Sequence, residues 1–148
     1  MRATTALPAL SLAVLSLLAA CSEQATTTDS APAAATATLA GVDLNKPLTV
    51  LGTEPFWNVK ITPETLTYTS PETPPLSGAN PGPVVRGTTA AYRTKLKGRG
   101  LELTLIATEC SDGMSDRTYP LTAIVKLGDE TLNGCAIGEA ALAALPPA

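Results

Sequence analysis

Apolar and polar residues alternate along short runs through much of the chain, a pattern typical of β-strands with one buried face. The clearest run covers residues 56–62 and places Trp57, Val59 and Ile61 on one face. Further runs of β-forming composition are separated by turn residues and cover 47–51, 65–69, 88–96, 101–106, 121–127 and 130–135. The pattern predicts an all-β domain over residues 41–138, a small antiparallel barrel or sandwich of about seven strands.

Two segments depart from this alternation. Residues 70–87 contain five prolines, and proline cannot donate a hydrogen bond to a β-ladder. We therefore expect a long surface loop between strands there, either a functional loop or a plain insertion. Residues 138–145 are rich in Ala and can form one or two helical turns, so residues 139–148 are predicted to be a frayed tail.

The N-terminus has the layout of a secretion signal. Arg2 is the only charged residue before Glu23, and the apolar stretch between them ends in small residues. This arrangement predicts a signal peptide over residues 1–20. The end of this segment, LAAC at residues 18–21, resembles the bacterial lipobox, in which a signal peptidase cleaves before a cysteine that carries diacylglycerol. An ordinary signal peptide cleaved nearby and an uncleaved membrane anchor are the alternatives.

Lipidation of Cys21 predicts a membrane anchor built from diacylglycerol and an added acyl chain such as palmitate, without a spanning helix. Residues 21–40 have no large apolar side chain before Leu39, which predicts a disordered tether. Ser22 rather than Asp follows the cysteine. By resemblance to enterobacterial sorting rules, this favours the outer membrane, with the domain facing the periplasm. The inner membrane and the cell surface are the alternatives.

Cys110 and Cys135 remain as an even pair once Cys21 carries lipid, and a pair suits the oxidising space beyond the inner membrane. We expect a structural disulfide between them. In the chain-entropy model it closes a loop of about 25 residues and contributes about 3.5 kcal/mol. The alternatives are a redox pair, for which the usual CxxC spacing is absent, and two metal thiolates, which lack companion ligands.

Composition removes several classes of function. The formal net charge of −3 argues against a nucleic-acid binder, which needs a basic face. The 148-residue chain has no His, the commonest general base and transition-metal ligand. It also has no P-loop, GxGxxG or SxxK motif. The sequence predicts a protein that is not an enzyme and has no catalytic site, metal site or cofactor. Paired carboxylates stay open, because their spacing in a β fold cannot be read from sequence.

Three motifs look specific: GTEPFW at residues 52–57, CSDGMSDRTYP at 110–120 and GCA at 134–136. Together they resemble a family of bacterial envelope proteins that carry GxEPFW, CxDGMSDxxYP and a late GCA or GCG. Such proteins are described as membrane proteins or lipoproteins, sometimes beside META-type and lysozyme-inhibitor-type small β domains. The resemblance covers about residues 41–136. It implies an envelope location and brings no activity with it.

The first motif contains the only Phe and the only Trp of the chain, Phe56 and Trp57. Both are expected to anchor a core that is otherwise aliphatic. Glu54 is the odd member of this motif. We expect it to cap a loop through backbone amides, to pair with Arg117, or to present a functional carboxylate to solvent.

The second motif is dense in Ser, Thr and Asp, which bond neighbouring backbone groups and build turns. One interpretation of residues 110–119 is therefore a rigid loop pinned by the disulfide. The other has the carboxylates of Asp112, Asp116 and Glu109 facing a cation, although the ligand register of an EF-hand is absent. With Glu54 and Arg117, these two aspartates form the candidate functional surface.

The lipid anchor, the tether and the lack of catalytic groups favour a protein-binding or assembly-support module that contacts another envelope protein. An inhibitor of such a protein is a concrete version, although ten acids and nine bases in residues 41–138 make no strongly acidic face. The alternative is a sensor or carrier of a small ligand or metal ion. It would use a barrel mouth or the loop from Cys110 to Tyr119.

Overall fold

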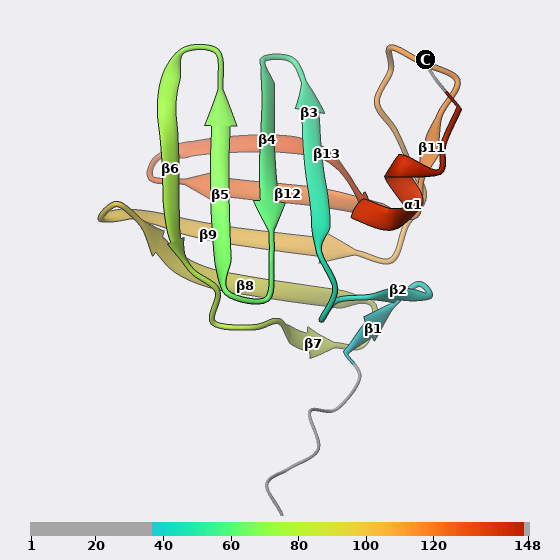
Figure 1. Ribbon diagram of the computed structural model, residues 1–148, viewed down its shortest axis with the longest axis horizontal. Helices are drawn as coiled ribbons and strands as arrows, with labels where there is room; N and C mark the ends of the chain where they lie inside the picture. The colour runs from blue at the N-terminus through green and yellow to red at the C-terminus, as the bar shows by residue number, and fades with distance from the viewer. Residues whose placement is uncertain (1–36, 147–148) are drawn as a thin grey trace, which may run out of the picture. The chain divides into compact units, whose positions relative to one another are not determined.

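The computed structural model describes residues 37–146. The predicted signal peptide, Cys21 and most of the predicted tether lie outside the described residues. The described residues form an all-β domain with one short helix, so the predicted fold class is confirmed (Figure 1).

The main sheet is antiparallel and has nine strands in the order β6-β5-β4-β3-β13-β12-β9-β8-β7. Its strands are β3 (Leu48–Thr53), β4 (Phe56–Ile61), β5 (Thr65–Ser70), β6 (Thr73–Ala79), β7 (Val84–Arg86), β8 (Thr89–Leu96), β9 (Arg99–Ile106), β12 (Leu121–Leu127) and β13 (Glu130–Gly138). Two small hairpins pair β1 (Thr38–Leu39) with β2 (Val42–Asp43) and β10 (Cys110–Ser111) with β11 (Thr118–Tyr119). The described residues therefore hold thirteen strands rather than about seven, because short pairings that alternation cannot reveal add to the main runs.

The sheet curls on itself, so that β3 to β6 form one layer and cross over β8, β9, β12 and β13 in the other (Figure 1). The curl brings β6 against β8. The backbone N–H of Lys97 donates to the carbonyl oxygen of Ser77 at 3.1 Å, and Thr94 Oγ1 donates to the carbonyl oxygen of Ala79 at 2.9 Å. Gly78 is needed at this seam, because a Cβ there would overlap the carbonyl oxygen of Lys95.

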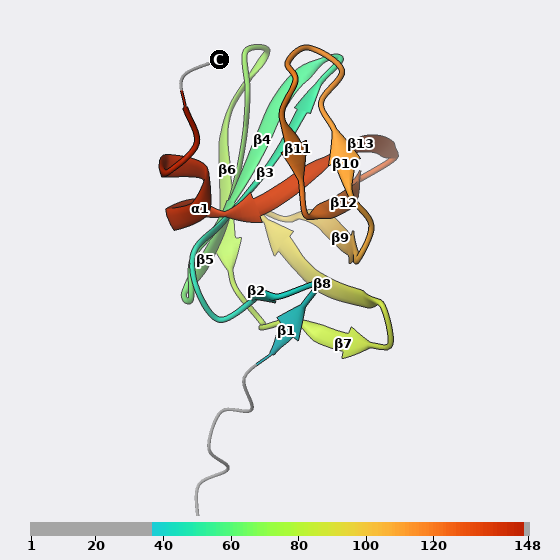
Figure 2. The ribbon, with the colours of Figure 1, turned by 90° about the vertical axis from the view of Figure 1, so that its right-hand side faces the viewer.

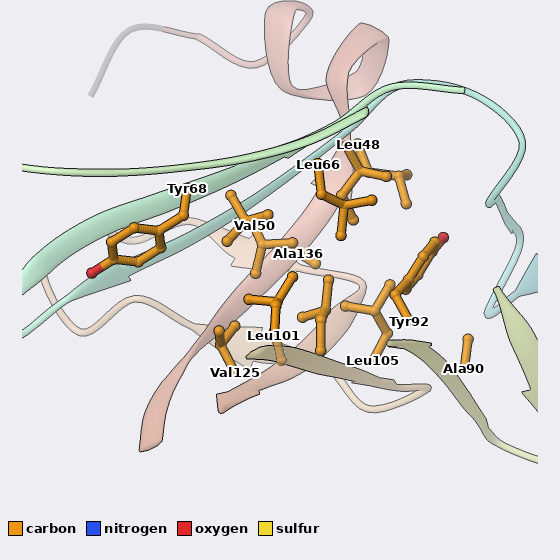
Figure 3. Packing of buried hydrophobic residues seen from close by; sticks show 14 of the residues in the cluster. Leu48, Val50, Leu66, Tyr68, Ala90, Tyr92, Leu101, Leu105, Val125 and Ala136 are labelled. Carbon is orange, nitrogen blue, oxygen red and sulfur yellow. The ribbon is translucent and has the colours of Figure 1, made fainter. Parts of the chain in front are cut away.

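The apolar faces of both layers meet in one core, shown in part in Figure 3. The buried side chains of this core include Leu48, Val50, Trp57, Val59, Ile61, Leu66, Tyr68, Tyr92, Leu103, Leu105, Leu121 and Val125. The predicted inward face of residues 56–62 is thus confirmed. The prediction for Phe56 is wrong, since its side chain is 57% exposed. Successive side chains of a strand point to opposite faces, so Phe56 and its neighbour Trp57 cannot both face the core.

The proline-rich segment 70–87 is not the structureless loop that its composition predicts. It holds β6 and β7. The register of β6 on β5 shifts between Tyr68 and Ser70, so that Pro74 and Pro75 oppose a single residue. Such a bulge leaves ladder positions unpaired, and a strand at the end of a sheet tolerates residues without an N–H.

The N-terminal boundary of the domain also differs from the prediction. Residues 37–40, expected at the end of the tether, belong to the β1–β2 hairpin. Leu39 and Leu44 are almost fully buried, and the hydroxyl of Tyr92 donates to the carbonyl oxygen of Leu44 at 3.5 Å. The hairpin therefore covers one end of the curled sheet (Figure 2).

The C-terminal segment predicted as a frayed tail contains helix α1 (Glu139–Ala143). The Glu139 carboxylate accepts from Lys60 Nζ at 2.8 Å, and the Glu139 N–H donates to the carbonyl oxygen of Pro47. Leu142 and Leu145 pack against a small second cluster formed by Tyr119, Cys135 and Ile137. Residues 139–146 thus extend the packed domain.

Candidate functional site

The predicted disulfide is present. Cys110 of β10 and Cys135 of β13 are bonded, with their Cα atoms 5.5 Å apart. The bond attaches the small β10–β11 hairpin to the main sheet and leaves residues 112–117 as the connecting loop. Because this loop is tied at its base, its tip has little freedom to move away from the sheet.

Asp112 organises the loop from within. Its carboxylate accepts from the backbone N–H groups of Met114 at 3.0 Å and Ser115 at 2.9 Å. It also accepts from the hydroxyls of Ser115 and Tyr119, each at 3.0 Å on Oδ2. The Met114 and Ser115 N–H groups are the main reason that the pKa of Asp112 is lowered to about 2. Both carboxylate oxygens are thus used by the loop itself.

Tyr119 is the buried end of this network. Its side chain is 3% exposed and packs with Cys135 and Ile137. Burial, followed by the hydrogen bond to Asp112, raises the pKa of the Tyr119 hydroxyl. The tyrosine therefore stays a neutral donor to the carboxylate, which fixes the loop to the second apolar cluster.

The loop lies against the tip of the β3–β4 hairpin, where the first motif falls (Figure 2). Thr53 Oγ1 donates to the backbone carbonyl oxygen of Asp112 at 3.0 Å. The peptide bond between Glu54 and Pro55 at the hairpin tip is cis. The two motifs that are far apart in sequence are therefore adjacent in the fold.

The first and third motifs meet at Trp57. A Cβ at Gly52 would overlap the indole ring, and a Cβ at Gly134 would overlap the carbonyl oxygen of Leu51 and touch the same ring. Trp57 is 4% exposed, and its Nε1 has no hydrogen-bond partner among the described residues. Gly52 of GTEPFW and Gly134 of GCA therefore leave the space that the Trp57 ring occupies.

The four candidate surface residues do not form one contact set. The guanidinium of Arg117 donates to the carbonyl oxygen of Pro146, and no ion pair joins it to Glu54 within residues 37–146. The expected Glu54–Arg117 pairing is therefore not formed. Asp116 is exposed on the loop, whereas Asp112 is partly buried. Only Asp112 has a defined set of partners.

Sequence reasoning missed a cavity between the hairpin tips. A space of about 480 Å³ lies where the β3–β4 and β5–β6 hairpins approach the starts of β9 and β13, and we call it the hairpin cavity. Its walls include Glu54, Tyr68, Glu72, Arg99, Glu130 and Leu132. The only indication of it in the sequence is that Tyr68 faces inward in the alternation of its strand and lies close to the end of that strand.

Comparisons with protein-family models, curated proteins and solved structures find no match to this chain. Within the part of the chain that the structure describes, no cluster of three or more Cys, Asp or Glu is arranged to hold a metal ion. None of the helices in that same part has the length and apolar character needed to cross a membrane.

Proposed function

We propose that this protein is an envelope lipoprotein, anchored through Cys21 in the outer membrane, whose β domain binds another envelope protein in the periplasm. In this proposal the protein is a binding module and not an enzyme. The observation that carries the proposal is the exposure of Phe56 beside a rigid loop. The lipobox-like LAAC and the resemblance of the three motifs to envelope proteins support the location.

Phe56 differs from every other aromatic side chain that the structure describes. It is 57% exposed, whereas Trp57, Tyr68, Tyr92 and Tyr119 are each at most 5% exposed. An exposed aromatic ring gives the isolated domain no burial energy. Aromatic side chains are, however, the most frequent anchors of protein interfaces, where they fill a pocket of the partner.

The surroundings of Phe56 suit a preorganised interface. Met114 on the neighbouring loop is 65% exposed, and the loop is held by the disulfide, by Asp112 and by Thr53. A surface that is already ordered loses little conformational entropy on binding. We call Glu54, Phe56, Met114, Asp116 and Arg117 the docking surface.

The alternative, a small-ligand or metal site in the loop from Cys110 to Tyr119, receives less support. A cation there needs carboxylate oxygens that are free to coordinate it. Both oxygens of Asp112 already accept hydrogen bonds within the loop. Asp116 is left as the only other carboxylate among residues 112–117.

The test is a crosslinked pull-down of the full lipoprotein from its own envelope, read by quantitative mass spectrometry. We expect one stoichiometric protein partner, whose recovery falls at least about tenfold with Phe56→Ala. Val84→Ala on β7 is the matched control, because Val84 is similarly exposed at 53% but lies away from the docking surface. Equal recovery with both variants, or an empty pull-down, contradicts the proposal. Thermal melting of each variant separates lost binding from lost folding.

A further inference from the structure

The hairpin cavity is a second feature that the docking surface does not explain. Its volume of about 480 Å³ lies within the range of small-molecule sites, roughly 300–1,000 Å³. The walls combine apolar surface from Tyr68 and Leu132 with carboxylates from Glu54 and Glu72. Concave apolar sites with a few converging polar groups are the usual form of a ligand site.

Tyr68 supplies the strongest indication that something binds there. Its side chain is 5% exposed, yet its hydroxyl makes no hydrogen bond to any residue in the described range. The hydroxyl points away from Val50 and Leu66 in the aliphatic core (Figure 3). The other two tyrosines are also buried, but Tyr92 donates to Leu44 and Tyr119 donates to Asp112.

The hydroxyl itself keeps access to the cavity, because Trp57 Nε1 is the only fully buried side-chain N or O atom without a partner among the described residues. Tyr68 is the only tyrosine that borders the hairpin cavity. Its ring stacks on Trp57, with centroids 6.4 Å apart and planes 22° apart, so the ring cannot swing aside without disturbing the core. The hydroxyl is thus held at the cavity wall, where it is free to bond a molecule that enters.

The charges around the cavity indicate what kind of molecule this is. Arg99 is already used, since it donates to Glu130 at 2.8 Å and to the carbonyl oxygen of Leu127 at 3.0 Å. Glu54 and Glu72 have no ion-pair partner within residues 37–146. The walls thus carry two uncompensated negative charges beside an aromatic ring. Such a site attracts cations and repels carboxylates and phosphates.

We propose that the hairpin cavity binds an organic ammonium ion with an apolar body. The ammonium group donates to the carboxylates of Glu54 and Glu72 and to the hydroxyl of Tyr68, while the body lies against Leu132 and the tyrosine ring. The cavity shares Glu54 and Phe56 with the docking surface, but Tyr68, Glu72 and Leu132 lie outside that surface. The proposal does not require the protein partner proposed above.

The test uses three probes with the same phenyl body and different charge: phenethylammonium, neutral phenethyl alcohol and anionic 3-phenylpropionate. Each is titrated into the full-length protein in detergent, followed by calorimetry and by the fluorescence of the single Trp57, which stacks on Tyr68. We expect saturable binding of phenethylammonium, binding of the alcohol at least about tenfold weaker, and none of the anion. Equal binding of alcohol and ammonium, or no saturable binding of phenethylammonium, overturns the proposal.

Matched variants then locate the site. Tyr68→Phe removes only the unpartnered oxygen, so we expect unchanged melting and ammonium binding weakened roughly tenfold. Glu72→Gln is expected to weaken binding. Glu64→Gln makes the same charge change in the β4–β5 turn, at the end of β5 opposite to the cavity, and is expected to leave binding unchanged. Equal weakening by both glutamine variants means that the effect is general electrostatics, and it overturns the assignment to the hairpin cavity.

Discussion

At one end of the curled sheet the hydroxyl of Tyr92 donates to the carbonyl oxygen of Leu44, whereas at the hairpin cavity the hydroxyl of Tyr68 has no partner in the described residues. Both rings are buried on the inner face of the sheet. The first end is covered by a segment of the chain itself, the β1–β2 hairpin (Figure 2). The difference shows that covering an end needs an added segment, and that an uncovered end leaves polar groups available to a ligand.

The largest expected effect tests the covered end. Leu44→Ala removes an almost fully buried side chain, so we expect the free energy of unfolding to fall by about 2–5 kcal/mol. Leu132→Ala at the hairpin cavity removes a partly buried side chain beside existing empty space, so its loss should be about 1 kcal/mol. Urea denaturation measures both. Equal losses would contradict the contrast between the two ends.

A smaller effect is expected when only the two hydroxyls are removed. Tyr92→Phe leaves the carbonyl oxygen of Leu44 without its donor, which should lower the free energy of unfolding by about 1 kcal/mol. Tyr68→Phe removes an oxygen that has no described partner, so stability without ligand should stay the same or rise. The pair of substitutions is matched in chemistry and burial. A larger loss for Tyr68→Phe than for Tyr92→Phe would reverse the comparison.

Lowering the pH is expected to destabilise the loop of residues 112–117 beside the β3–β4 hairpin and to leave the covered end unchanged. The pKa of Asp112 is lowered from 3.8 to about 2, chiefly by the N–H groups of Met114 and Ser115. A lowered folded-state pKa means that the stabilisation is complete above about pH 4. It is lost as the pH falls through about 2. The amide NMR signals of Met114 and Ser115 should therefore move in this window, while that of Tyr92 should not.

Asp112→Asn is the control for this acid transition. The variant cannot gain a proton, so the movement of the Met114 and Ser115 signals between pH 4 and 2 should disappear. Persistence of the transition in the variant would assign it to another acid. A transition centred near the ordinary Asp pKa would show that the N–H groups do not hold the carboxylate in solution.

The smallest effect concerns the ion pair at the hairpin cavity. Arg99 and Glu130 are partly exposed, with 36% and 59% of their side-chain surface accessible. Exposed pairs contribute about 0–1 kcal/mol, so Glu130→Gln should change the free energy of unfolding by less than about 1 kcal/mol. Denaturant melts at low and high salt provide the measurement. A larger loss would mean that this end is also stabilised by its own residues.

Much of the fold could be predicted because it follows from local pattern. Alternation placed Trp57, Val59 and Ile61 on the inner face. The two cysteines that remain when Cys21 is assigned to lipidation predicted the Cys110–Cys135 bond. Both inferences use only the residue itself and its neighbours in sequence or number. The first succeeds because burial of one strand face does not depend on which strands finally meet, and the second because two cysteines leave only one pairing.

The features that the sequence did not predict depend on contacts between residues far apart in the chain. Strand β6 accepts Pro74 and Pro75 only because its register shifts where they lie opposite β5. The bond from Thr53 to Asp112 joins residues 59 positions apart. The hairpin cavity exists because turns from both layers converge, so the unpartnered state of Tyr68 could not be read from its strand. Phe56 is different, since strand alternation alone already excluded burying it together with Trp57.

The seam between β6 and β8 has a consequence for association between chains. An open nine-stranded sheet has two edges whose free N–H and C=O groups can pair with strands of another molecule. Here β6 lies against β8 through the Lys97–Ser77 hydrogen bond and the close approach at Gly78. The other edge, β7, is three residues long and follows Pro83. A single glycine at the seam thus helps protect the folded chain from edge-to-edge aggregation.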